Sequence, residues 1–462
     1  MRIDTTLTPA SLLPAIRRMW EASAGKILSI DAAMAGSKGA PVHTVAGRYQ
    51  PRGWTEWTRG FEYGSALLQF DATGEERFLA LALERIPVGM PAHVTAFGVH
   101  DHGFNQVSTY GTLRRLLLEG RIAPDHWLAA YVDLALRCSG AVQAHRWTDL
   151  GNGEGFIHSF NGPHSLFVDT MRTLRALVLA ERLGHVMLGE NDQPVSMLGR
   201  TVAHLSATAR YNVFYGEGRD IYDERGRTAH EAIFDTNNGA FRSVATQQGY
   251  SAFSTWTRGL AWAMLGFAEQ LEYFATLPEP ALEPWGGKAV LTALMDKAAA
   301  ATCDFYIAHT TEDGIPYWDT GAPGLARIAD PYANRSDPGN DIEPMDSSAA
   351  AIGAQGLLRY GAWRQASGLD GGARYVGAGL TVAATLLAPP YLSTDTGHQG
   401  LLLHSQYHRP NGWDYVPPGH RTPFGEATMW GDYHLRELAL LLQRRAEGGP
   451  ALTFFGPAEA LP

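Results

Sequence analysis

Two aspartates are the side chains of this sequence whose type and setting could carry acid–base chemistry. Asp101 lies between two histidines in the stretch VHDHGF, and Asp169 opens an apolar stretch that follows FNGPHSLFV. A carboxyl group that is buried, or that lies near a second carboxylate, binds its proton more tightly than it does in water. We therefore expect a raised pKa for Asp169, which suits a general acid at neutral pH, with Asp101 as its like-charged neighbour.

A second group of polar and aromatic side chains lies at the mouth of an expected helix, in QQGYSAFSTWTRGLAW. Gln248, Trp256 and Arg258 fall within eleven residues there, and His230 lies upstream in GRTAHEAIFD. Aromatic rings can stack on sugar rings, whereas amide, imidazole and guanidinium groups bind hydroxyls and carboxylates. The stretch predicts a pocket for a sugar or another flat ligand, although aromatic residues more commonly pack in the core.

A metal site is the competing interpretation of His100, Asp101 and His102. Two histidines that are two positions apart diverge on a helix, and no third ligand follows at a standard spacing. We therefore expect no metal here, and Asp101 is either a buried, hydrogen-bonded residue or a catalytic carboxylate. For Asp169, the simpler alternative is an acidic residue that favours the dipole of its own helix.

Two further stretches can be explained by structure alone, although the first also has a functional interpretation. The run WTEWTRGFEYG either packs as an aromatic loop on the rim of the fold or walls a sugar ring through Trp57. Asp346, which two serines follow, predicts a helix cap.

Composition argues against several classes of partner. The chain has 462 residues, a net charge of −10 and no long run of Lys or Arg, which disfavours nucleic acid. Its two cysteines, Cys138 and Cys303, lie far apart and cannot form a disulfide framework. No window reaches the roughly 20 apolar residues of a membrane span, and the N-terminus lacks an apolar run of signal-peptide length. We therefore expect a cytoplasmic protein with no membrane partner.

The elements that must position these residues are mainly helices. Apolar residues recur at helical spacing in the stretches 65–86, 110–121, 123–144, 165–184, 196–213, 259–277, 291–310, 347–363, 375–389 and 433–447. The stretch 165–184 is apolar on nearly all sides, which is typical of an inner helix. Alternating runs on either side of NNG, within 226–246, predict a β-hairpin. We predict an all-α toroid, with an inner ring of helices inside an outer ring, a small hairpin in a rim loop, and a single domain over residues 1–462.

Taken in order along the chain, these stretches resemble the unsaturated glucuronyl hydrolases, glycoside hydrolase family 88. The family's patterns appear at Trp57–Phe61, His100–Phe104, Asp169–Met171, Gln248–Trp262, Pro316–Asp319, Asp346–Ala350 and Trp430–Tyr433. Each motif is short, but the ordered set is specific, and the likeness spans roughly residues 50–445.

The resemblance implies an (α/α)6 barrel and a hydrolase that removes a 4,5-unsaturated uronic acid from lyase-generated oligosaccharides without a cofactor. The family's two essential acids map to Asp169, which would protonate C4 and help activate the water, and to Asp101, which would tune it. The substrate-binding residues that it implies are Trp57, His230, Gln248, Trp256, Arg258 and Trp262. We assign Arg258 to the substrate carboxylate because a guanidinium group suits that geometry.

Three residues depart from the family's patterns, and two alternative functions stay open. Leu260, Gln247 and Glu62 replace the usual residues, and we expect them to line the mouth and to affect the choice of substrate. The segment 326–344 is the expected specificity loop, or else only a surface connection rich in Pro and Asp. The alternatives are an inverting glycosidase that acts on saturated sugars and a sugar-binding protein without activity.

Overall fold

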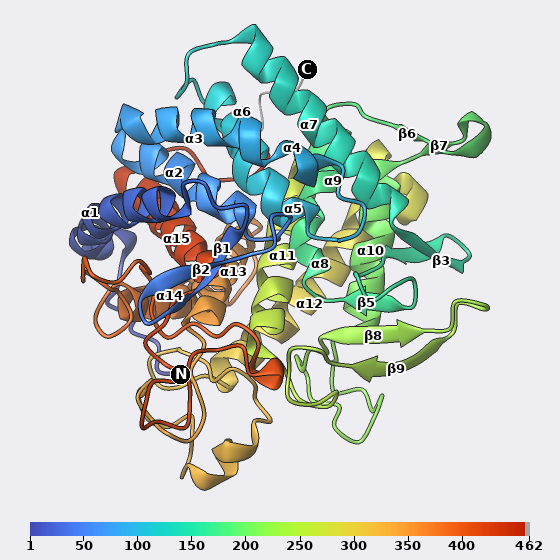
Figure 1. The fold of residues 1–462 in the computed structure, drawn as a ribbon. Coiled ribbons are helices and arrows are strands. Elements are labelled where there is room, and N and C mark those ends of the chain that lie inside the picture. The colour runs from blue at the N-terminus through green and yellow to red at the C-terminus, as the bar shows by residue number, and fades with distance from the viewer. Residues whose placement is uncertain (458–462) are drawn as a thin grey trace.

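Helices that alternate between an outer and an inner ring dominate the computed structural model, which describes residues 1–457 (Figure 1). The outer helices are α1 (Pro9–Met34), α3 (Glu76–Gly89), α7 (His126–His145), α10 (Met197–Tyr211), α12 (Lys288–Ala308) and α14 (Gly372–Leu386). The inner ring contains α2 (Arg59–Thr73), α5 (His102–Gln106), α6 (Thr112–Leu118), α8 (Thr170–Thr173), α9 (Arg175–Arg182), α11 (Thr257–Thr276), α13 (Ser347–Ala366) and α15 (Met429–Glu447). A π-helical turn, Val107–Gly111, joins α5 to α6, and the short α4 (Pro91–Val94) precedes them.

The inner ring closes on itself. Contacts run from α2 to α5, from α5 to α8 and α9, and then through α11, α13 and α15 back to α2. Each of these inner segments follows an outer helix in the chain, so that the described residues form the predicted (α/α)6 toroid.

Burial distinguishes the two rings. Every residue of α11 from Thr257 to Leu271 is buried, whereas α12 buries mainly one apolar stripe. In α9, only Glu181 is not buried. The prediction of an inner helix within 165–184 is therefore confirmed.

The inner helices approach each other so closely that glycine lies at their contacts. A β-carbon added to Gly103 of α5 would lie 2.3 Å from Cα of Thr173 in α8. Similar contacts join Gly60 of α2 to the backbone of Asn105, Gly266 of α11 to the backbone of Met171, and Gly356 of α13 to the backbone of Leu265. A larger residue at these points would require the backbone of the neighbouring helix to shift.

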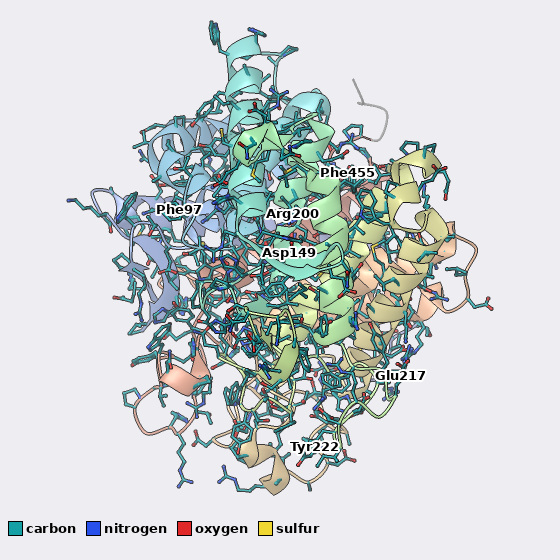
Figure 2. All side chains as sticks on the ribbon, turned by 90° about the vertical axis from the view of Figure 1, so that its right-hand side faces the viewer. Phe97, Asp149, Arg200, Glu217, Tyr222 and Phe455 are labelled. Atoms are coloured by element: carbon teal, nitrogen blue, oxygen red, sulfur yellow. The ribbon has the colours of Figure 1, made fainter. Side chains whose placement is uncertain are left out.

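The predicted hairpin is present, and further strands accompany it. β8 (Glu231–Phe234) pairs with β9 (Phe241–Ala245), and β5 (Ser165–Phe167) extends them to an antiparallel sheet. The sequence did not predict the pairs β1 (Ala40–Val45) with β2 (Arg48–Arg52), β3 (Trp147–Gly151) with β4 (Glu154–Ile157), and β6 (Met187–Leu188) with β7 (Pro194–Val195). Strands this short give too few residues for alternation to differ from a loop pattern. The β3–β4 hairpin lies over α10, where the guanidinium carbon of Arg200 is 3.9 Å from the centroid of the Trp147 ring (Figure 2).

The helices of the structure differ from the predicted ones in three places. The stretch 65–86 is two helices, because α2 ends before Gly74, which has a left-handed φ of 72°. The stretch 165–184 begins with β5 and not with a helix. Helix α1, which begins with a capping box between Thr8 and Ser11, was not predicted from the sequence.

The core is continuous round the ring. One cluster of buried apolar side chains extends from Leu12 to Phe455, and a smaller cluster, which includes Phe156 and Phe234, lies by the β5–β8–β9 sheet. Within residues 1–457, no helix combines the length and the apolar character that a membrane crossing requires.

We predict that Gly103→Ala destabilises the protein by about 1–3 kcal/mol, because the new methyl group overpacks against backbone that cannot rotate away. Thermal unfolding followed by circular dichroism would measure the loss. Gly98→Ala is the matched control, since a β-carbon at Gly98 meets no atom within 4 Å. Equal melting temperatures for the two variants would contradict the close approach of α5 to α8.

Candidate active site

A pocket of about 290 Å³ lies where several inner helices begin. Asp101 and Asp169 occupy the N-cap positions of α5 and α8, Trp256 occupies that of α11, and Trp57 immediately precedes the N-cap of α2. All four line the pocket. The toroid therefore brings together residues that lie up to 199 positions apart in the chain.

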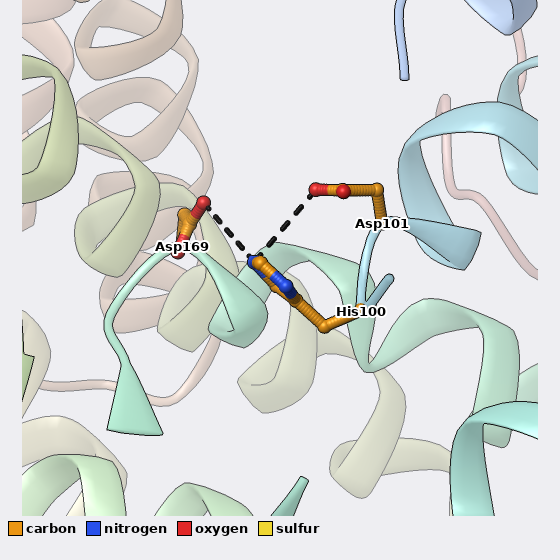
Figure 3. A group of neighbouring side chains, drawn as sticks. All are labelled: His100, Asp101 and Asp169. Carbon is orange, nitrogen blue, oxygen red and sulfur yellow. Dashed lines mark ion pairs between the residues drawn. The ribbon is translucent and has the colours of Figure 1, made fainter. Parts of the chain in front are cut away.

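The two aspartates lie on either side of His100 (Figure 3). Nε2 of His100 is 3.7 Å from Oδ1 of Asp101 and 3.5 Å from Oδ2 of Asp169. All three residues are buried, and the imidazole is 1% exposed. Phe160 stacks on the imidazole at a centroid distance of 5.9 Å and further limits its contact with water.

The pKa order of the aspartates is the reverse of the predicted one. Burial raises the pKa of Asp101, and the nearby Asp169 carboxylate adds to this effect against the opposing charge of His100. Burial also acts to raise the pKa of Asp169, but the charge of His100 and its hydrogen bond outweigh burial and lower it. The prediction of a raised pKa for Asp169 is therefore wrong for this state of the pocket, because the sequence did not reveal the cation beside it.

His100 is the proton carrier of this group. Burial acts to lower the pKa of the imidazole, but the carboxylates of Asp101 and Asp169 outweigh it and raise the pKa above the ordinary 6.5. The arrangement thus places an imidazole that binds its proton more tightly than usual between two carboxyl groups, of which Asp169 is held ionised. Such a group can pass a proton from His100 to Asp169 without a change in its total charge.

The same three side chains also have the spacing of a possible metal site. Their ligand atoms lie within 4.8 Å of one another, and imidazole and carboxylate groups both bind metal ions. This set was not predicted from the sequence, because Asp169 is distant in the chain from His100. A metal requires an unprotonated imidazole, so a proton and a metal ion exclude each other at Nε2.

His230 and Gln248 lie beside the acids and are joined through the backbone. Nδ1 of His230 accepts hydrogen bonds from the N–H groups of Gln247 and Gln248, at 2.9 and 3.3 Å. Burial lowers the pKa of His230 to about 4, so that the ring is neutral and carries its proton on Nε2. That buried nitrogen has no partner within residues 1–457, which leaves an N–H available as a donor.

Both terminal nitrogens of Arg258 are engaged by protein groups. Its Nη1 donates to Oδ2 of Asp346 at 2.8 Å and to the carbonyl of Gln406 at 2.7 Å. Its Nη2 donates to Oε1 of Gln248 at 2.9 Å and to the carbonyl of Tyr407 at 2.7 Å. A substrate carboxylate could therefore reach either terminal nitrogen only by displacing one of these partners. Gln248 and Tyr407 both line the pocket, but only Gln248 binds Arg258 through its side chain.

Tryptophans form much of the remaining wall. Trp57 stacks on Trp430 with ring centroids 4.8 Å apart. Trp256 lies 4.7 Å from the guanidinium carbon of Arg258, and the buried Trp262 packs against Phe104 at 4.7 Å. The structure thus brings all the predicted site residues to one region, although His230 lies behind the surface that lines the pocket.

Several lining residues were missed, and some predictions about the mouth were wrong. The segment that contains Tyr407, His408, Asn411 and Trp413 lines the pocket, as does Glu56, whereas no residue of 326–344 does. The aromatic and polar run YHRPNGW was the available sequence signal for this wall. Of the three departures from the family's patterns, Gln247 alone lines the pocket, as expected.

The other two departures point away from the mouth. Leu260 is 1% exposed and belongs to the core. Glu62 forms a buried ion pair with Arg59 at 2.9 Å. Neither side chain lines the pocket, so the expectation that they would do so is wrong.

Comparison with known proteins links this fold and pocket to one enzyme class. A protein named unsaturated glucuronyl hydrolase, from Bacillus sp. (strain GL1), is 27% identical over 447 residues, which cover 93% of this chain and 98% of the relative. An unsaturated chondroitin disaccharide hydrolase of Streptococcus pyogenes serotype M1 is 24% identical, with coverage of 84% and 81%. No family model matches the sequence.

Solved structures with a similar fold include a protein of the same name. A crystal structure of the unsaturated glucuronyl hydrolase from Bacillus sp. GL1 superposes with a TM-score of 0.65 at 22% identity, covering 92% of this chain and 97% of that one. The helical toroid is therefore the fold of a group of glycoside hydrolases. More particularly, the chain is a homologue of the unsaturated glucuronyl hydrolases, as the ordered motifs indicated.

We predict that His100 stays protonated to a pH above 6.5, whereas His230 remains neutral above about pH 4. Both ring signals can be followed by NMR in histidine-labelled protein. Asp169→Asn should lower the pKa of His100, because it removes one of the two carboxylates that raise it. A His100 that is unprotonated at pH 6 would contradict the proton-bridged group, and recovery of its titration after EDTA treatment would identify a metal ion as the cause.

Proposed function

We propose that this protein hydrolyses oligosaccharides that carry a 4,5-unsaturated uronic acid at the non-reducing end, and that it releases that sugar. The observation that carries the proposal is the buried group of His100, Asp101 and Asp169, which line a pocket walled by tryptophans. The names of the relatives support the same activity. The ligand is thus an unsaturated uronyl oligosaccharide.

Protonation of C4 is the first chemical requirement of this reaction. The double bond of the substrate is an enol ether conjugated with the carboxylate, so that a proton added at C4 leaves positive charge at C5, which the ring oxygen shares. Water then adds at C5. The resulting hemiketal opens, and the aglycone leaves without a displacement at the anomeric carbon.

We assign the proton transfer to Asp169, with His100 as the source of the proton. The imidazolium lies 3.5 Å from Asp169, and the negative charge of a bound uronate would raise the pKa of that carboxyl group and favour transfer to it. Asp169 then protonates C4 and, as a carboxylate, accepts a proton from the attacking water. Return of that proton to His100 restores the starting state, with one water molecule consumed.

Asp101, His230 and Gln248 have supporting roles in this proposal. Asp101 raises the pKa of His100 and so keeps the proton in the group. The amide nitrogen of Gln248 is a donor for sugar hydroxyls or water, and His230, behind the lining, orients Gln248 through the hydrogen bonds that its Nδ1 accepts from the N–H groups of Gln247 and Gln248. Trp57 and Trp256 wall the sugar ring.

The helix arrangement favours an anionic ligand in a chain whose net charge is −10. Trp57 and Trp256 lie at the N-terminal ends of α2 and α11, where the helix dipole gives a positive potential. This potential supports binding of the uronate carboxylate even though Arg258 is engaged within the protein. An Arg258 contact to that carboxylate stays a prediction, and it would require displacement of Gln248.

The distance between the acids argues against the alternative of an inverting glycosidase. Inverting enzymes hold their two carboxyl groups about 6.5–9.5 Å apart, which leaves room for a water molecule. Ligand oxygens of Asp101 and Asp169 lie within 4.8 Å of each other. This separation is shorter than the inverting range, and Nε2 of His100 lies near both carboxyl groups, at 3.7 and 3.5 Å.

The remaining predictions concern the number of domains, the location in the cell and the need for a cofactor. We propose that the described residues act as one catalytic domain, which the continuous apolar core supports. We also propose a cytoplasmic location, in keeping with two unpaired cysteines, Cys138 and Cys303. The proposed reaction consumes only water and needs no metal or organic cofactor.

We predict that Asp169→Asn and Asp101→Asn each lower turnover by at least about 100-fold, since each removes a group that takes part in general acid–base catalysis. The assay is the loss of ultraviolet absorbance of the conjugated double bond in a panel of lyase-generated unsaturated disaccharides. Asp370→Asn is the matched control, because Asp370 is exposed and lies outside the pocket. Near-wild-type turnover by Asp169→Asn would refute its assignment, and no absorbance loss with folded wild-type protein would refute the proposed function.

A further inference from the structure

The segment 406–414 forms a fixed wall of the pocket. Arg258 donates to the carbonyls of Gln406 and Tyr407, each at 2.7 Å. The carboxylate of Asp414 accepts hydrogen bonds from the N–H groups of Tyr407 and His408. Peptide groups of this segment are therefore bound by charged side chains, with Arg258 on the carbonyls and Asp414 on the N–H groups, so the segment is held in place before any ligand arrives.

Trp413 is the outermost aromatic ring of this wall. Its ring lies 5.1 Å from that of Tyr407 and 4.8 Å from that of His408, as measured between centroids. Trp413 is 41% exposed, whereas Asp101 and Asp169 are 8% and 7% exposed. A sugar ring that reaches the acids therefore leaves Trp413 to contact whatever is attached to that sugar.

Arg52 supplies a positive charge next to this outer ring. It is exposed at the end of β2, with its guanidinium carbon 5.4 Å from the centroid of Trp413 and 5.8 Å from that of Tyr407. Within residues 1–457, Arg52 forms no ion pair, in contrast to Arg258. Its charge nevertheless reaches the pocket, because it acts to lower the pKa of the lining residue Glu56, which burial raises.

We propose that Trp413 and Arg52 form the subsite for the second sugar of the substrate, the one bonded to the unsaturated uronate. Trp413 stacks on the face of that sugar, and Arg52 pairs with an acidic substituent on it. A carboxylate and a sulfate ester share the chemistry that a guanidinium group recognises. This inference rests on the proposed function, since the second sugar is defined by the position of the first.

The test compares three unsaturated disaccharides that differ only in the second sugar, which is neutral, carries a carboxylate or carries a sulfate. Arg52→Gln should lower kcat/KM about tenfold for at least one acidic substrate, with a clearly smaller loss for the neutral one, because a partly exposed charge-assisted hydrogen bond is lost. The acidic substrate that responds identifies the substituent. Trp413→Ala should lower kcat/KM for all three substrates.

Arg48→Gln is the matched control for net charge. Arg48 is exposed at the other end of the same strand, about 13 Å away at the usual rise per residue. Among the described residues, Arg52 and not Arg48 places its guanidinium group over Trp413 and Tyr407. Equal effects of Arg52→Gln on neutral and acidic substrates, or equal effects of the Arg52 and Arg48 variants, would overturn the subsite. If either result is found, turnover of the neutral substrate by the wild-type protein would still show that the proposed function holds. Absence of turnover on all three would refute the function and, with it, the subsite.

Discussion

Close contact between the inner helices is the constraint on which the site depends. Gly60, Gly103, Gly266 and Gly356 each lie against the backbone of a neighbouring inner helix, so that the ring is narrow enough for its helix N-termini to meet in one pocket. Asp101 and Asp169 occupy the N-cap positions of adjacent inner helices, and the contact of Gly103 with Thr173 sets the distance between those helices. The motif WTRGF and the motif HDHGF each contain one of these glycines. Close packing of the inner helices therefore explains why glycine occupies that position in each motif.

The narrow ring also determines the electrostatics of the acid group. Burial makes an isolated charge costly, and the three side chains limit this cost by placing a cation between two carboxyl groups. Asp169 is thereby held ionised and the pKa of His100 is raised, the reverse of the simpler picture in which Asp169 keeps its own proton. The proton remains available within 3.5 Å of Asp169, so the chemistry proposed for that residue survives the change in its resting state.

The sequence predicted the toroid, its hairpin and the region in which the site residues meet, because helical periodicity and ordered motifs are local signals. Three kinds of feature escaped it for physical reasons. The pKa order depends on His100 lying between two carboxyl groups, only one of which is its neighbour in the chain. The wall at Tyr407 to Trp413 lies in an irregular segment whose position is fixed by buried hydrogen bonds to Arg258 and Asp414, and these have no sequence period. Leu260 and Glu62 were placed at the mouth because helix phase was not enough to separate a pocket face from a core face.

The most direct test of the account is proton NMR of an unsaturated uronyl disaccharide incubated with the protein in D₂O. Protonation of C4 by a residue that exchanges with solvent predicts that the vinyl proton signal disappears as the aglycone is released and that one deuterium enters at C4. Release of the aglycone while the vinyl signal of the freed sugar persists would mean cleavage at the anomeric carbon. That result would contradict the role given to His100, Asp101 and Asp169.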